Sequence, residues 1–232
     1  MERKQTSRKT KRTAIIATLL ACVLLIGGTV AWLTTHDSLS NQFTVGNINP
    51  IDPTEPDGGP DDNPIDKDES KLNGNLYEPD WVANSKIFPG ETVVKNPYVG
   101  VGAGSEKCYV YVYVNNTMKN DNKVYFTIND GWEAVEATTT GTDGEYVGGI
   151  FKYTAGLDGS QATKNVWTTT PLFSDVVAKD TATGDDFMTA DGTKAGAIEV
   201  HSFQHQMFDG EGQVIDEANV VIPAAKAAFG IK

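Results

Sequence analysis

The chain has 232 residues, of which 31 are acidic and 19 are basic, so its formal net charge is −12 at pH 7. A chain this acidic repels nucleic acid and anionic lipid, and nucleic-acid binding is therefore not expected. Of its two cysteines, Cys22 lies in an N-terminal apolar run and Cys108 further along, so no internal disulfide is expected once that run is removed.

Residues 1–31 have the layout of an export signal. Six basic residues and one acidic residue precede an apolar run of about twenty residues, long enough to cross a bilayer. Small residues end the run, and we expect cleavage between Ala31 and Trp32. The basic start keeps the N-terminus cytoplasmic, so the rest is exported whether the helix is cleaved or retained as a membrane anchor. That exported part has 13 basic and 30 acidic residues, a net charge of −17.

Two segments with little apolar content of their own follow. Within residues 32–48, Leu39, Phe43 and Val45 alternate with polar residues, and this period of two predicts a half-buried strand. A strand this short needs a sheet to join. Residues 49–72 are rich in proline and acidic residues, a composition that predicts a disordered acidic linker. The strand would then be tethered, free to join its own domain or a neighbour's.

Residues 73–232 are predicted to form an all-β domain, a β-sandwich. The strongest strand is expected at residues 107–115, with Cys108 and the valines facing the core and the tyrosines facing either another layer or an exposed sheet face. Further strands are expected at residues 123–128, 132–137, 146–153, 166–173 and 197–208, separated by turn residues. After them, Asp216 is expected to cap a helical segment, with a short helix from about Pro223.

Several short motifs resemble the TasA/camelysin family. They are Ile-Gly-Gly-Thr-Val-Ala-Trp-Leu-Thr-Thr at residues 26–35, Asn-Gln-Phe-Thr-Val-Gly-Asn at residues 41–47, Glu-Pro-x-Trp at residues 78–81, Pro-Gly-Glu at residues 89–91 and Lys-Asn-Pro at residues 95–97. The resemblance implies a jelly-roll-like sandwich, processing by a SipW-type signal peptidase, and a fibre-forming protein of the Gram-positive cell surface or biofilm matrix. The linker is longer than the family pattern leads us to expect, and residues 119–194 match nothing in it.

Strand donation is the mechanism that we expect for such assembly. Leu39, Phe43 and Val45 of one copy would pair with an open sheet edge of the next copy, through main-chain hydrogen bonds and side-chain pockets. Repetition of this contact without closure gives a filament. The expected partners are therefore the signal peptidase and other copies of the chain or other matrix proteins, with the membrane contacted only through the signal helix.

Catalytic and metal sites are not predicted, although camelysin-type relatives are described as metallo-endopeptidases. The sequence has no His-Glu-x-x-His motif. His201 and His205 are four apart, but the surrounding alternation indicates a strand, where such residues lie about 13 Å apart. A site built from Glu199 and His201 is conceivable, and an inward-facing Cys108 would be a poor nucleophile. No cofactor is expected, and the alternatives are a secreted metallo-endopeptidase and a monomeric surface adhesin or ligand-binding module.

Overall fold

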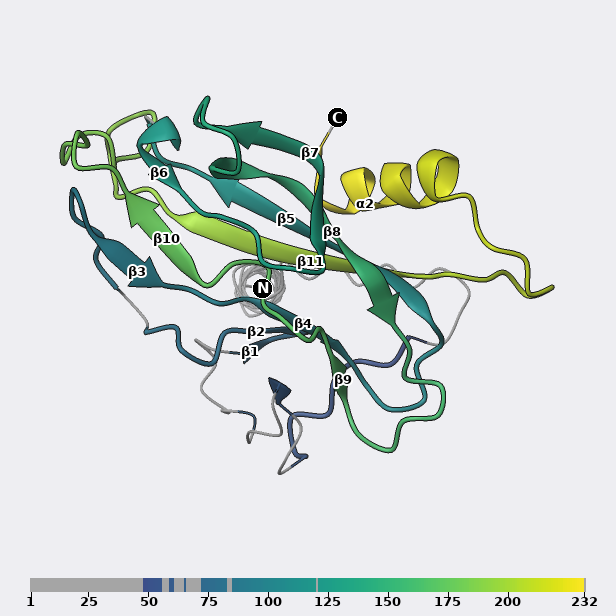
Figure 1. Ribbon diagram of the computed structural model, residues 1–232. Coiled ribbons are helices and arrows are strands. Elements are labelled where there is room, and N and C mark those ends of the chain that lie inside the picture. Colours follow the sequence, from purple (N-terminus) through teal and green to yellow (C-terminus); the bar gives the residue numbers. More distant parts are fainter. Residues whose placement is uncertain are drawn as a thin grey trace, which may run out of the picture. The chain divides into compact units, whose positions relative to one another are not determined.

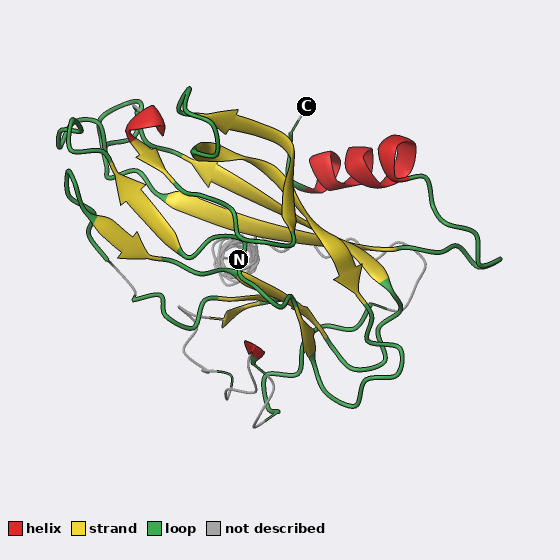
Figure 2. Cartoon of the chain, in the orientation of Figure 1, coloured by secondary structure: helices red, strands yellow, loops and turns green. Residues whose placement is uncertain are grey.

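The computed structural model describes residues 48–55, 59–60, 65, 72–82, 85–119 and 121–231. These residues all belong to one unit of the chain, Leu39–Lys232. The described part is mostly β-structure, which confirms the all-β prediction (Figure 2). Its strands are β1 Leu72–Asn73, β2 Leu76–Tyr77, β3 Thr92–Val94, β4 Tyr98–Val101, β5 Cys108–Asn116, β6 Val124–Tyr125, β7 Trp132–Thr139, β8 Tyr146–Leu157, β9 Val166–Trp167, β10 Asp175–Ala178 and β11 Ile198–Gln206.

The strands form three antiparallel sheets in two layers. One layer is the long sheet with strand order β11-β5-β8-β7. The other contains the three-stranded sheet β3-β10-β6 and the four-stranded sheet β1-β2-β4-β9, which face the long sheet (Figure 1). The main apolar core combines side chains from β4, β6 and β10 with others from β5 and β8, so it fills the space between the layers.

The strand β5 divides its side chains as the sequence predicts. Val110, Val112 and Val114 are at most 1% exposed and belong to the core between the layers. Burying a side chain of this size contributes about 1.5–3 kcal/mol relative to exposure. The tyrosines point to the other face of the long sheet, because side chains alternate along a strand.

That tyrosine face is covered by the C-terminal segment. The π-helix η3, Glu217–Val221, runs directly into the α-helix α2, Ile222–Ala228, and Val221 and Ala225 pack against Tyr109 and Tyr111. As predicted, the Asp216 side chain caps the start of this segment, accepting a hydrogen bond from the Asn219 N–H at 3.0 Å. The tyrosines are therefore packing residues under a helix, and Figure 1 shows α2 lying beside the long sheet.

The first residues of the predicted linker differ from the expectation of disorder. Asn49 donates its backbone N–H to Ser105 Oγ at 2.9 Å and its side-chain amide to the Ala103 carbonyl at 2.7 Å. Further on, Asp52 exchanges hydrogen bonds with Asn165, and Ile51 is buried. Polar side chains thus fix a segment whose composition offers almost no apolar surface. For residues 49–55 the structure thus differs from the expected disorder, because hydrogen bonds to the β4–β5 loop and to Asn165, between β8 and β9, hold this segment.

Two of the predicted strands are shorter than expected. The segment at residues 166–173 forms only the two-residue strand β9, because Thr168 turns its hydroxyl to the Val99 N–H and Pro171 has no N–H to donate. The segment at residues 123–128 is a strand only at Val124–Tyr125, after the 3₁₀-helix η2 Asp121–Lys123. The strand β10, Asp175–Ala178, lies outside every predicted range and forms the centre of its sheet.

Candidate functional site: a groove between two edge strands

The residues predicted to carry function lie outside the described part of the chain. These are Ala31 and Trp32 at the expected cleavage point, and Leu39, Phe43 and Val45 of the donor segment. The predicted signal helix lies outside it too, and no helix among the described residues is long and apolar enough to cross a membrane. The described body does, however, show where a strand could be received.

A groove of about 370 Å³ opens where the two layers meet at one side of the sandwich. Val93 of β3 and Val176 of β10 line it from one layer, and Ile198 of β11 lines it from the other. Among the described strands, β3 pairs only with β10 and β11 only with β5, so both are edge strands. The rest of the lining is formed by Trp81, Ser85, Ile87, Lys95, Met118, Gly196 and Ala197.

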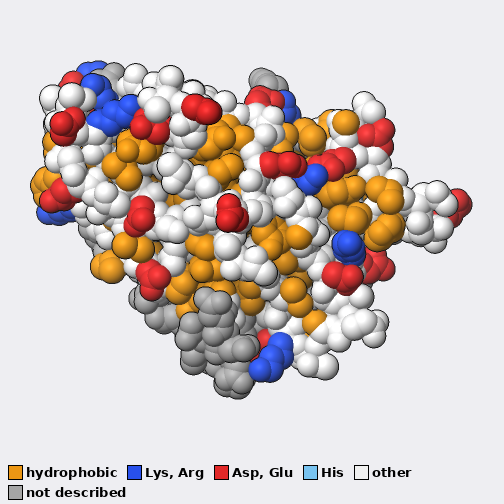
Figure 3. All heavy atoms as spheres, in the orientation of Figure 1, with side chains coloured by type: hydrophobic (Ala, Val, Ile, Leu, Met, Phe, Trp, Pro, Cys, Tyr) orange, Lys and Arg blue, Asp and Glu red, His pale blue; other side chains and the backbone are white. Residues whose placement is uncertain are grey.

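The lining is of the kind that normally belongs to a core. Ile87, Met118 and Ile198 are partly buried against the main core cluster, and Val176 is a member of it. On the outside, Val82, Phe88 and Val94, which lie on β3 or within ten residues of it, are 67%, 54% and 47% exposed. Figure 3 shows acidic side chains scattered over the face seen in Figure 1, with hydrophobic surface between them.

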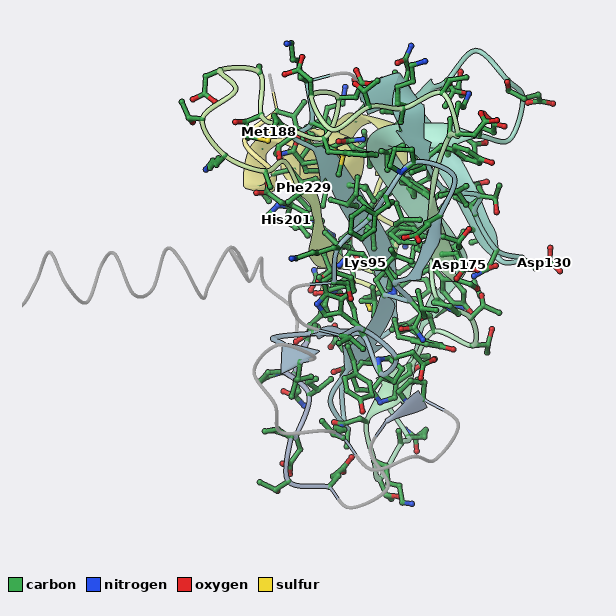
Figure 4. All side chains as sticks on the ribbon, turned by 90° about the vertical axis from the view of Figure 1, so that its left-hand side faces the viewer. Lys95, Asp130, Asp175, Met188, His201 and Phe229 are labelled. Atoms are coloured by element: carbon green, nitrogen blue, oxygen red, sulfur yellow. The ribbon has the colours of Figure 1, made fainter. Side chains whose placement is uncertain are left out.

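One wall of the groove is held by a buried ion pair. The Lys95 ammonium is 2.7 Å and 2.9 Å from the two carboxylate oxygens of Glu78, and the lysine is 8% exposed. The ammonium also lies 4.6 Å from the centroid of the Trp81 ring, within range of a cation–π interaction. Lys95 appears near the middle of Figure 4, which looks at the side of the molecule where β3 lies.

This wall explains why two of the sequence motifs occur together. Glu-Pro-x-Trp supplies Glu78 and Trp81, and Lys-Asn-Pro supplies Lys95. The neighbouring residues are joined as well, because the Asn96 side-chain amide donates to Asp80 Oδ2 at 2.8 Å and its oxygen accepts from the Asp80 N–H at 3.2 Å. Residues of the two motifs therefore bind each other directly beside the groove.

The strand β11 has an unusual inner face. Its register places Ser202, Gln204 and Gln206 opposite Val112, Val110 and Cys108, so these polar residues share a face with the core side of β5. They are 6%, 8% and 7% exposed. Nevertheless, Ser202 Oγ, Gln204 Nε2 and Gln206 Oε1 have no hydrogen-bond partner in the structure as described. Most buried polar atoms are paired, so this row on an edge strand requires an explanation.

The histidines and carboxylates that could form a metal site are engaged elsewhere. As predicted, His201 and His205 lie on a strand; His201 stacks on Tyr113 with ring centroids 6.0 Å apart, close to Phe229 (Figure 4). Glu199 accepts a hydrogen bond from Asn115 at 2.9 Å. Within the described ranges, no group of three histidine, cysteine, aspartate or glutamate side chains could hold a metal ion.

The cysteine is suited to packing and not to catalysis. Cys108 is fully buried in the core cluster, which confirms the prediction that it faces inward. Burial raises the pKa of its thiol to about 12, so the nucleophilic thiolate is scarce at neutral pH.

Sequence reasoning missed most of the groove. Met118, Val176 and Ile198 lie 22 or more residues apart along the chain, and no local pattern links them. The polar row did leave a signal, because Ser202, Gln204 and Gln206 interrupt the apolar alternation that Ile198 and Val200 begin.

Comparisons with known proteins add no relatives: no family model, curated protein or solved structure matches this chain.

Proposed function

We propose that this chain is an exported structural protein of the cell surface or extracellular matrix, and that its copies assemble into filaments by strand donation. The resemblance of its motifs to the TasA/camelysin family supports export, processing by a SipW-type peptidase and a jelly-roll-like strand order. The observation that carries the assembly step is the groove between β3 and β11. It is lined by core-type side chains and flanked by two edge strands of the described body.

The donor segment matches what this groove would accept. Leu39, Phe43 and Val45 place apolar side chains on one face of an extended segment, and the groove offers apolar side chains from both layers. Strand addition supplies main-chain hydrogen bonds along an edge, while the inward side chains fill pockets. Burying a phenylalanine or leucine in such a groove contributes about 1.5–3 kcal/mol each. Together these terms favour a specific contact between copies.

The anchoring of residues 49–55 shortens the tether. Ile48 packs against the main core and Asn49 is hydrogen-bonded to the β4–β5 loop, so only Gly46 and Asn47 separate Val45 from the anchored part of the chain. A short connection fixes the distance and direction between successive copies better than a flexible linker of 22 residues does. This geometry favours a stiff filament over a loose chain of domains.

Sedimentation and electron microscopy of the chain starting at Trp32 test the proposal. Filaments should form as the concentration rises. Phe43→Asp should keep the chain monomeric, because a carboxylate would have to enter the apolar groove. The matched control is Thr44→Asp, which places the same charge on the opposite face of the donor strand and should leave filaments intact.

Two results would contradict strand donation. One is a Phe43→Asp chain that forms filaments as readily as its parent. The other is a parent chain that remains monomeric at all concentrations. The second result would favour a monomeric binding module, since a groove of about 370 Å³ is also in the size range of small-ligand pockets.

A further inference from the structure

Large exposed apolar side chains gather in two places on the described body. Six such side chains are at least 38% exposed among the described residues: Val82, Phe88, Val94, Phe208, Val214 and Val220. The first three form what we call the β3 rim, and each directly follows a residue that lines the groove. Phe208 and Val214 form what we call the tip, beyond the end of β11. Two separate apolar surfaces on one chain permit a head-to-tail contact between copies.

The tip is a hairpin that is already held in shape. Phe208 and Val214 are antiparallel bridge partners, so their side chains lie on the same side of the hairpin. Asp209 donates its backbone N–H to the Gln213 carbonyl at 2.9 Å, and its side-chain oxygen accepts the Gln213 N–H at 2.8 Å. Because these hydrogen bonds fix the turn, the two apolar side chains lose little conformational freedom when they pack against a partner.

The tip and the β3 rim lie too far apart to meet within one copy. Ile198, at the start of β11, lines the groove beside β3, and the nine-residue strand places Gln206 about 26 Å from it. Phe208 follows two residues beyond Gln206. Figure 1 shows β3 at the left of the view and the loop after β11 projecting at the right. A contact between the two surfaces therefore requires two copies.

The donor segment is attached to the body at the same end as the tip. Asn49 is hydrogen-bonded to Ser105, just before Cys108, whose partner in β11 is Gln206. From Val45 to Asn49 the chain can span at most about 14 Å. If the donor segment of one copy enters the groove of a second copy, this short connection holds the tip of the first copy near the β3 rim of the second.

Resting on the proposed function, we infer that the tip of one copy packs on the β3 rim of the next copy, as a second contact beside the donated strand. Charge favours this arrangement over a symmetric contact between two tips. Residues 207–225 contain four acidic residues and no lysine or arginine, so two tips would repel each other. The β3 rim spans residues 82–94, which contain one lysine, Lys86, and one acidic residue, Glu91, so it does not repel the acidic tip.

Two matched valine-to-aspartate changes test the tip. Val214 is 64% exposed, and Val220, on η3 and outside both surfaces, is 47% exposed. In the chain starting at Trp32, Val214→Asp should raise the critical concentration for filament formation at least tenfold, because a carboxylate would be buried against the β3 rim. Val220→Asp should leave the critical concentration unchanged. Urea unfolding of both chains checks that neither change alters the stability of the body.

Alanine changes on both surfaces test whether they meet. Phe208→Ala and Phe88→Ala should each raise the critical concentration about three- to tenfold. The two residues lie near opposite ends of β11, which is about 26 Å long, so within one copy they act independently and their effects would multiply. If they meet between copies, the double change should raise the critical concentration little more than either single change does.

Three results would overturn the contact between the tip and the β3 rim. They are filaments from Val214→Asp at the parent's concentration, an equal rise from Val220→Asp, and multiplying effects of the two alanine changes. Each of these results leaves strand donation intact, which Phe43→Asp tests separately. Absence of filaments from the parent chain overturns both proposals.

Discussion

The buried ion pair beside the groove provides a quantitative test of the structure. Glu78→Gln removes the negative partner and leaves the Lys95 ammonium nine-tenths buried, at 2.7 Å from what was a carboxylate oxygen. Removing one partner of a buried pair costs about 3–5 kcal/mol, because the remaining charge has lost its compensation. The ring of Trp81 retains part of the attraction, about 1–2 kcal/mol. We therefore expect a loss of about 3 kcal/mol in the free energy of unfolding.

Urea unfolding of the chain starting at Trp32 measures this loss, from a shift of the midpoint at constant slope. A control pair with the same geometry and a different environment is available in Lys119 and Asp185. Its nitrogen–oxygen distance is also 2.7 Å, but its side chains are 43% and 69% exposed. Exposed pairs contribute about 0–1 kcal/mol, so Asp185→Asn should change stability little. Adding Lys95→Met to Glu78→Gln should recover most of the loss, because no unpaired charge remains.

A loss of stability from Glu78→Gln no larger than that from Asp185→Asn would contradict this prediction. So would a chain with both Glu78→Gln and Lys95→Met that is less stable than the chain with Glu78→Gln alone. Either result would mean that the carboxylate does not compensate the buried ammonium.

Three further predictions concern other parts of the body. Gly102→Ala should release the segment at residues 49–55 to proteolysis, because the added Cβ would lie 2.1 Å from the Pro50 carbonyl oxygen. Asp216→Ala should cost about 1 kcal/mol in urea unfolding, the usual value of a lost N-cap, and a larger loss would mean that Asp216 does more than cap. The pKa values of Cys108 and Tyr111 are raised, chiefly by burial, so both groups contribute stability that is complete below their ordinary pKa values and is lost as pH rises. At a fixed urea concentration, the free energy of unfolding should therefore fall as pH rises above about 9. In Tyr111→Phe it should fall less steeply with pH, because one of the two groups is gone.

The sequence predicts the long strands of this fold well because their patterns are local. In β5 the alternation of valine and tyrosine is enough to separate the core face from the helix face. Short strands cannot be predicted in this way. The strand β10 has only four residues, and it is fixed by pairing with β3 and β6. Such pairing depends on residues far apart in the chain, and no window of sequence contains it.

The candidate site also combines local motifs, which the sequence shows, with long-range contacts, which only the structure shows. The motifs at residues 78–81 and 95–97 are visible in the sequence, but only the structure shows Lys95 between Glu78 and Trp81. The anchoring of Asn49 could not be predicted from composition, because it depends on hydrogen-bond acceptors in the β4–β5 loop. Composition measures the apolar surface that a segment can bury, and this segment is fixed by polar contacts instead.

The polar row also bears on why an exposed edge would not lead to indiscriminate association. An open edge strand invites any extended segment to pair with it, and natural sheets limit this with features that make wrong pairing costly. Here Ser202 Oγ, Gln204 Nε2 and Gln206 Oε1 are already buried without a partner among the described residues, so an all-apolar strand beside β11 would relieve none of that cost, which is about 1–3 kcal/mol for each group. A strand that brings polar side chains to this row would relieve part of that cost. The same three side chains thus favour a strand with polar residues at the matching positions over an all-apolar strand, which is how specificity arises from a difference between affinities.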